Sequence, residues 1–360
     1  MLLFISIYFW VVVLLFWHSN ISQYDRKSRV QPLLMFLVFI HLLFAFEGGD
    51  YFNYYEAVVS HNMDATENFY RILADFVGYN YLVFRIVVWG GAFLFFQLTS
   101  YRFKLSVVKS TFLLYVMFFS IFDYARASLG MAVYFFGLSY LCMPIKKKRL
   151  LSFLFGASII VSSVIVHRSM AIAVLATGMI FIPISKKTLV AITLLFVMSA
   201  PLFNYLFNNF LMGNAFADQE INDIIASYAG HDFEGGFSVF EWVRRIVEYT
   251  TFFLTFILLS FKMFDKRLES DIRHQAMFKL YKVTLGLLML AISTQMIGVQ
   301  SFIIFYRYLY MSMIPLVLLF GYARERHLIS HRAFRFIISL CLLNNLFGTS
   351  KRIFGGNLNA

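Results

Sequence analysis

Residues 81–100 of this chain read YLVFRIVVWGGAFLFFQLTS, a run of 20 residues whose one charge is Arg85. About 20 helical residues of this kind cross the roughly 30 Å hydrocarbon layer of a bilayer. Comparable apolar runs recur along the whole chain, and no gap between them is as long as a soluble domain. The sequence therefore predicts an all-α, polytopic integral membrane protein with a single domain over residues 1–360.

The composition agrees with this class, because 60% of the 360 residues are hydrophobic and only 14% are charged. We expect about 12 transmembrane helices (11–13). Their predicted ranges are 2–18, 31–46, 81–100, 106–122, 125–143, 150–166, 169–185, 188–206, 244–263, 276–297, 302–321 and 334–349. The first run lacks basic residues before it and a small-residue cleavage site after it, so we expect a retained helix rather than a signal peptide.

The distribution of basic residues predicts the orientation, because short cytoplasmic loops retain Lys and Arg. With the N-terminus outside, 22 of the 31 Lys and Arg residues and only 5 of the 19 acidic residues are cytoplasmic. The cytoplasmic cations lie within residues 26–29, 102–109, 146–149, 186–187, 262–282 and 324–335. The two long loops, 47–80 and 207–243, are then extracytoplasmic. The net charge of +12 follows from this topology and gives no indication of nucleic-acid binding.

The outer side carries Arg in preference to Lys. Its cations are Arg71, Arg85, Arg126, Arg168, Arg244, Arg245 and Arg307, with Lys351 and Arg352 in a tail whose side stays open. Arg binds phosphate oxygens through two parallel N–H bonds and keeps its charge when partly desolvated. Each Arg taken singly could instead extend to the interface or pair with a carboxylate. Their clustering favours a phosphate-bearing ligand, held by Arg126, Arg168 and Arg307, with Arg85 and Arg244 as weaker candidates.

Residues 47–56, EGGDYFNYYE, follow an apolar segment and open the first outer loop. The two glycines permit unusual backbone angles and a close approach of a ligand. Asp50 is the first candidate for a catalytic base, which must lie within hydrogen-bond reach of an acceptor hydroxyl. The tyrosines that we expect to bind a sugar are Tyr51, Tyr54 and Tyr55. An ordinary aromatic belt with a turn is the alternative explanation of this stretch.

Two later helix ends supply further candidate residues. His167 closes an apolar run just before Arg168. Because a histidine has an unperturbed pKa of about 6.5, His167 is the second candidate for the base. Its alternative role is a histidine bonded to a backbone carbonyl at a helix end. Arg126 opens a helix on the same face, and Gly130, one turn later, leaves room for a neighbour.

We expect no cofactor and no bound metal. The sequence has no phosphate-binding glycine loop, dinucleotide fingerprint or zinc-ligand pair of cysteines. His327 and His331 are four residues apart but lie in a basic loop, and Asp218-Gln-Glu220 matches a metal-binding acidic pair only weakly. The acidic loop 207–243 is either a lid or acceptor platform, or a solvated surface.

Together these motifs resemble the EpsG-type, Wzy-like bacterial polysaccharide polymerases. The resemblance rests on Gly49-Asp50-Tyr51 with Tyr54 and Tyr55, on Arg126 in an Arg-x-x-x-Gly-like helix start, and on His167 at a later helix end. It covers roughly the first half of the chain. The family usually has Gly-Thr-Asp in place of Gly-Gly-Asp, often has an arginine where this chain has Ala45 to Glu47, and prefers Ala at the position of Gly130.

The resemblance implies a membrane glycosyltransferase, with a Wzy-like or GT-C-like fold, at the outer face of the bacterial cytoplasmic membrane. The implied donor is a growing glycan on undecaprenyl pyrophosphate, and the implied acceptor is a lipid-linked repeat unit. A chain-length regulator is a further partner, and the product is O-antigen, capsule or exopolysaccharide.

Two other functions need consideration. A flippase for lipid-linked oligosaccharide would need cations along the whole transmembrane depth, whereas here they cluster at one end. An acyltransferase acting on the same glycan would need a reactive constellation at the inner face to receive its acyl donor, and the sequence shows none there.

Overall fold

The computed structural model describes residues 9–13, 38, 49–63, 68–117, 125–145, 147–185, 188, 239–296 and 302–354. All regular structure within these ranges is helical, which confirms the predicted all-α class. The first half contains α3 (Gly49–Val59), α4 (Asn68–Phe76), α5 (Tyr81–Arg85), the π-helix η3 (Ile86–Gly90), α6 (Gly91–Arg102), α7 (Val107–Met117), α8 (Ala125–Cys142), α9 (Arg149–Val166), α10 (Met170–Thr177) and the 3-10 helix η5 (Gly178–Phe181). The second half contains α13 (Val239–Met263), η7 (Lys266–Leu268), α14 (Ile272–Met296), α15 (Phe302–Glu325) and α16 (His331–Phe354).

Two helices among the described residues are long and apolar enough to cross a membrane, Tyr81–Arg102 and Arg149–Val166. Shorter apolar helices cover Ala127–Cys142, Met170–Phe181 and Thr250–Met263. The full count of 12 spans therefore stays a prediction. The predicted spans 2–18, 31–46 and 188–206 lie mostly outside the described residues, as does the predicted loop 207–243, whose last five residues belong to α13.

Several boundaries differ from the sequence-based expectation. The stretch 47–80 is mostly helical, because α3 and α4 occupy it, and Gly49 begins α3 instead of forming a turn. The predicted span 169–185 stops being helical at Phe181, since Ile182 has an extended backbone with ψ 124°. Helices α15 and α16 run past their predicted ends into polar residues, which a helix can expose to water outside a bilayer.

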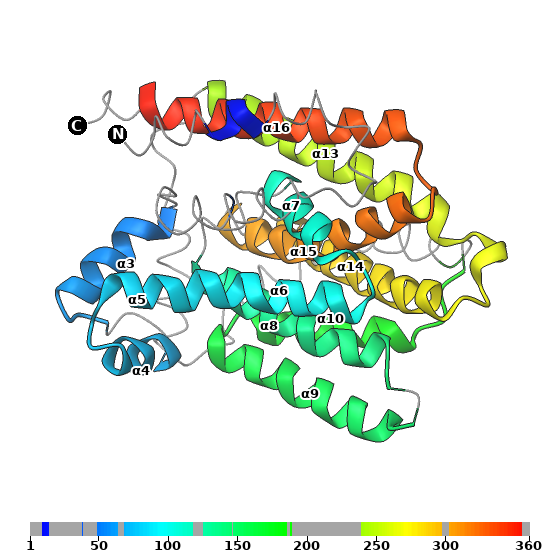
Figure 1. Ribbon diagram of the computed structural model, residues 1–360, viewed down its shortest axis with the longest axis horizontal. Helices are drawn as coiled ribbons and strands as arrows, with labels where there is room; N and C mark the ends of the chain where they lie inside the picture. Colours follow the sequence, from blue (N-terminus) through cyan, green and yellow to red (C-terminus); the bar gives the residue numbers. More distant parts are fainter. Residues whose placement is uncertain are drawn as a thin grey trace.

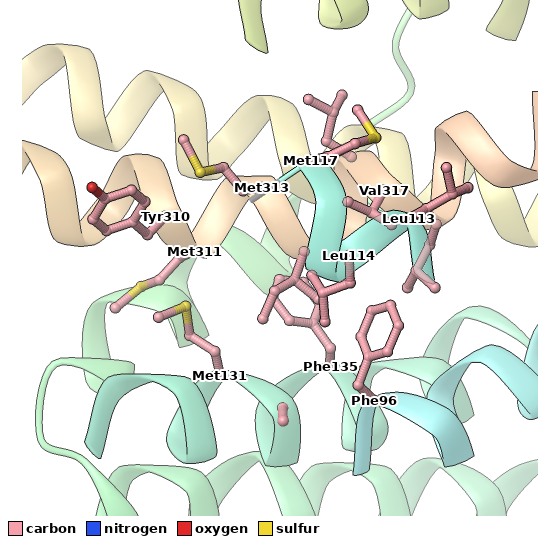
Figure 2. Packing of buried hydrophobic residues seen from close by; sticks show 14 of the residues in the cluster. Phe96, Leu113, Leu114, Met117, Met131, Phe135, Tyr310, Met311, Met313 and Val317 are labelled. Carbon is pink, nitrogen blue, oxygen red and sulfur yellow. The ribbon is translucent and has the colours of Figure 1, made fainter. Parts of the chain in front are cut away.

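Close helix crossings depend on glycines. A Cβ on Gly137 of α8 would lie 2.8 Å from the carbonyl oxygen of Gly156 in α9, and a Cβ on Gly286 of α14 would lie 2.7 Å from Met179 in η5. Small residues of this kind let helix backbones approach each other in membranes. Buried side chains of α6, α7, α8 and α15 form a core that includes Phe96, Leu114, Phe135 and Met311 (Figure 2).

Most of the long helices run along one axis of the molecule, so that their ends gather at two opposite ends (Figure 1). One end holds the C-termini of α6, α8 and α15 and the N-termini of α7 and α14. Arg102 donates to the carbonyl oxygen of Met143 at 2.6 Å, and the N–H of Ser106 donates to Glu325 at 3.1 Å. Arg273 also donates to Glu325, which joins α14 to α15. We call this the basic end, because the predicted cytoplasmic cations of these loops lie there.

Candidate functional site

The end of the molecule opposite the basic end, called the second end here, is where the candidate arginines and His167 lie in the backbone. Helices α6, α8, α13 and α15 each end at the basic end (Figure 1). Helices α8, α13 and α15 therefore begin toward the opposite end, and so does the continuous helical segment α5–η3–α6. The candidate residues near those starts are Arg85, Arg126, Arg244 and Arg307. Helix α9 starts at the basic end, because Ser152 near its start accepts from the N–H of Ile145, and so it brings His167 to the second end.

His167 is fixed at the junction of α9 and α10. Its N–H donates to the carbonyl oxygen of Ser163, and its own carbonyl oxygen accepts from the N–H of Met170, both at 2.9 Å. Its backbone is extended, with φ −153° and ψ 115°, so the chain reverses direction within two further residues. The side chain is only 6% exposed. Helix α9 ends at Val166 and α10 begins at Met170, which confirms the expectation from the predicted ranges 150–166 and 169–185 that the two helices join almost without a loop.

Gly130 of α8 packs directly against this junction. A Cβ added at Gly130 would lie 2.9 Å from the Cβ of His167 and 3.2 Å from the Cγ of Met170. The neighbour for which Gly130 leaves room is therefore His167. Arg126 lies one helical turn before Gly130, so the backbone brings the start of α8 to the histidine, although the Arg126 side chain lies outside the described part.

Helix α10 is also held against α8 by a buried tyrosine. The hydroxyl of Tyr134 lies 2.8 Å from the carbonyl oxygen of Ala173 and 2.9 Å from the hydroxyl oxygen of Thr177. Tyr134 lies in α8, and Ala173 and Thr177 lie in α10, so the contacts join these two helices. These contacts hold α10, which begins just after His167, against the helix that carries Gly130.

The candidate arginines differ in their surroundings. Arg168 is exposed although it adjoins buried His167. Arg85 is 4% exposed, and its guanidinium carbon lies 5.4 Å from the centre of the Trp89 ring. It directly precedes the π-helix η3, and such single-turn π segments are frequent at functional sites. No pattern in the sequence predicted this π-helix. The side chains of Arg244 and Arg307 lie outside the described part.

The tyrosines of α3 separate into two environments. Tyr54 is buried, and its ring stacks on Phe84 at 5.8 Å and lies 6.2 Å from Tyr70. Tyr55 is 47% exposed and meets Tyr81 edge to face at 5.2 Å. Tyr54 therefore packs α3 onto α5, whereas the Tyr55 ring is accessible to a ligand. Asp50 and Tyr51 lie in the first turn of α3, but their side chains lie outside the described part.

The basic end contains a second group of polar contacts, centred on Tyr322. The guanidinium carbons of Arg273 and Arg326 lie 5.2 Å and 6.0 Å from the centre of its ring, and Arg326 also pairs with Asp271. The hydroxyl of Tyr322 lies 3.1 Å from Nδ1 of His274. These contacts link α14 to α15, so we assign them a structural role. The spacing of these residues in the sequence did not indicate that they would meet.

Hydrogen bonds, charges and burial shift the pKa values of three side chains at the basic end. The hydrogen bond from the Arg267 side chain lowers the pKa of Asp265 to about 2. Burial raises the pKa of Asp271, but the N–H of Arg273 and the charge of Arg326 outweigh it, so the net direction is downward. Burial lowers the pKa of His274. The carboxylates are therefore ionised and His274 is neutral at neutral pH.

The described residues include no group of three or more His, Cys, Asp or Glu side chains able to hold a metal ion. His331, one of the two spaced histidines, accepts at Nδ1 from the Arg324 guanidinium at 3.0 Å. Asp218 and Glu220 lie outside the described part.

Comparison of the chain with protein-family models, with curated proteins and with solved structures finds no match. The fold and the site thus define a class only: an all-α protein with two helices, among its described residues, that are able to span a membrane.

Proposed function

We propose that this chain is a multi-pass membrane glycosyltransferase that extends a bacterial surface polysaccharide on undecaprenyl pyrophosphate at the outer face of the cytoplasmic membrane. The observation that carries the proposal is the packing of His167, between α9 and α10, against Gly130, one turn from Arg126. A buried histidine and an arginine-bearing helix start near one another offer two groups that sugar transfer from a pyrophosphate needs, a base and a positive charge.

The proposed reaction forms one bond and breaks one. The acceptor hydroxyl oxygen attacks the anomeric carbon of the donor sugar, and the bond from that carbon to the pyrophosphate oxygen breaks. The hydroxyl proton passes to a base, for which Asp50 is the first candidate and His167 the second. The lipid pyrophosphate leaves with the electron pair, and fixed guanidinium groups stabilise the negative charge that develops on it. Arg126, Arg168 and Arg307 are the arginines that we propose to bind the pyrophosphate, with Arg85 and Arg244 in supporting positions.

The other proposed ligand contacts are less central to the reaction. Tyr55 is the tyrosine of α3 best placed for a sugar, because its ring is half exposed. Tyr51 is assigned to the same sugar on sequence alone. Tyr54 supports them from the core through its stacking on Phe84.

A flippase remains the alternative in this proposal. In the two helices able to span a membrane, the charged residues lie near the ends: Arg85, Arg102 and Arg149. A ligand carried across the bilayer would meet no charge in the middle of these two helices, so their pattern favours a reaction at one face over translocation.

The test is a polymerisation assay with purified protein and a lipid-linked repeat unit, read out as both polymer length and substrate binding. We expect Asp50→Asn or His167→Gln to abolish polymer while binding persists, and Arg126→Lys to weaken both because Lys loses the two-pronged contact. Arg71→Lys is the matched control, since Arg71 is exposed, donates to the Asn68 side chain at 3.2 Å and is not a proposed ligand of the pyrophosphate. Unchanged polymer from all three variants would exclude this site, and substrate translocation without a new glycosidic bond would favour the flippase.

A further inference from the structure

Helix α4 has three distinct sides. Tyr70 and Ala74 are fully buried against the rest of the molecule. Ile72 and Phe76, one turn apart, are 65% and 87% exposed. Exposed Arg71 and Asp75 are also one turn apart and form the polar side. With 3.6 residues per turn these sets occupy different sectors of the helix, so α4 is amphipathic and leaves part of its apolar surface uncovered by the described residues.

A tight turn connects α4 to the helix Tyr81–Arg102. Gly78 has φ +61°, and its N–H donates to the carbonyl oxygen of Asp75 at 3.0 Å. The N–H of Tyr79 donates to the carbonyl oxygen of Ala74 at 2.9 Å, and the Tyr79 hydroxyl donates to the Asp75 carboxylate. The side chain of Asn80 then accepts from the N–H of Val83 and begins α5. These bonds fix the position of α4 relative to α5.

This turn brings α4 to the boundary of a membrane. Phe76 precedes Tyr81, the first residue of a helix able to span a bilayer, by five residues, which reach at most about 18 Å when extended. The turn shortens this distance further. Helix α4 also packs against α9, the second helix able to span a bilayer, which exposes Val161 and Ile165 in its second half.

We propose that α4 lies in the bilayer interface, with Ile72 and Phe76 inserted at the boundary between headgroups and acyl chains. Its partner is phospholipid, because the exposed apolar side chains adjoin the end of a predicted span and stand beside a polar side that carries Arg71. An amphipathic helix with this arrangement binds the surface of a membrane rather than crossing it. The proposal depends on the membrane-spanning role of Tyr81–Arg102 and is independent of the proposed glycosyl transfer.

The test measures the depth of nitroxide spin labels in the full chain, reconstituted into vesicles of phosphatidylethanolamine and phosphatidylglycerol. Cys142 and Cys341, both buried, are first replaced by Ala. Labels are then placed by Ile72→Cys and Phe76→Cys. The matched control on the polar side is Asp75→Cys, the aqueous control is Asn62→Cys, and the lipid control is Leu175→Cys, whose parent side chain is 71% exposed on apolar α10.

We expect labels at positions 72 and 76 to collide several-fold more with oxygen, which dissolves in lipid, than with a water-soluble nickel chelate, as the label at position 175 does. The label at position 75 should show the reverse preference, like that at position 62. Free access of the nickel chelate to positions 72 and 76 would overturn the proposal. Protection of both positions from both reagents would also overturn it, because another protein surface would then cover α4.

Discussion

At the scale of single residues, the contact between Gly130 and His167 makes a sharp prediction. Gly130→Ala places a Cβ 2.9 Å from the Cβ of His167, closer than carbon atoms pack, so the histidine must shift. A displacement of about 1 Å in a catalytic group costs on the order of 100-fold in rate. We expect polymer formation to fall by up to about 100-fold while the lipid-linked substrate still binds, and Gly130→Val to have the larger effect.

The matched control for Gly130 is Gly178→Ala, because a Cβ at Gly178 meets no atom within 4 Å. Gly178 has φ −55°, so Ala also suits its backbone. Equal rates for the Gly130 and Gly178 variants would show that the position of His167 does not limit the reaction.

A second residue-scale prediction concerns His274 and pH. Its Nε2 lies 3.2 Å from the carbonyl oxygen of Met263, which can only accept, so Nε2 carries the proton and Nδ1 accepts from Tyr322. Burial lowers the pKa of His274; the Met263 carbonyl and the charges of Asp271 and Asp265 act against burial, and Arg326 acts with it. The unfolded chain therefore takes up this proton first as the pH falls.

Stability from His274 should thus be complete above its unfolded pKa of about 6.5 and decline as the pH falls through its lower folded value. Thermal unfolding in detergent between about pH 7 and pH 5 measures this decline. His274→Gln removes the titrating group, so its melting temperature should depend less on pH over this window. An equally steep dependence in that variant would assign the decline to other groups.

At the scale of elements, the C-terminal end of α6 offers a position where one substitution should raise the free energy of unfolding. Lys104 follows α6 with φ +56°, where its N–H donates to Tyr101 and the next N–H, of Leu105, donates to Ser100. This pairing of bonds is the helix ending that favours glycine, because other residues lose about 1 kcal/mol or more with a positive φ. Lys104→Gly should raise the free energy of unfolding by about 1 kcal/mol.

Chemical or thermal unfolding in detergent measures this gain. Lys104→Ala removes the same side chain but keeps a Cβ, so it should give no comparable increase. If Ala stabilised the protein as much as Gly, the gain would come from the loss of the lysine charge at the basic end and not from the backbone.

The same elements show what sequence patterns can and cannot predict. The ends of α8 and α9 were predicted within two residues, because apolar runs and flanking charges mark them locally. Helices α3 and α4 were missed, since a short amphipathic helix next to a bilayer lacks the long apolar run that identifies a span. The contact of Gly130 with His167 joins residues 37 positions apart, and only the crossing of α8 with α9 and α10 brings them together. Local patterns indicated space beside Gly130 but not its occupant.

At the scale of the whole molecule, the loops that carry the predicted cytoplasmic cations can be compared with the arrangement of the helices. Predicted cytoplasmic loops that are far apart in the chain meet at the basic end, through contacts such as Arg102 with Met143 and Arg326 with Asp271. The C-terminal end of α9, which His167 follows, and the starts of α8, α13 and α15 lie toward the other end, spread across its width (Figure 1). If the chain spans a membrane, the positive-inside rule places the basic end in the cytoplasm.

This orientation predicts which positions a membrane-impermeant maleimide reaches in intact cells. Asn62, exposed after α3, should be labelled as Asn62→Cys without permeabilisation, and exposed Lys148 as Lys148→Cys only after it. The native chain serves as the unlabelled control, because Cys142 and Cys341 are both buried. The reversed pattern would place His167 on the cytoplasmic side. The proposed transfer between lipid-linked glycans at the outer face would then be wrong, whereas the interfacial position of α4 would be unaffected, because it requires a bilayer boundary but no particular side.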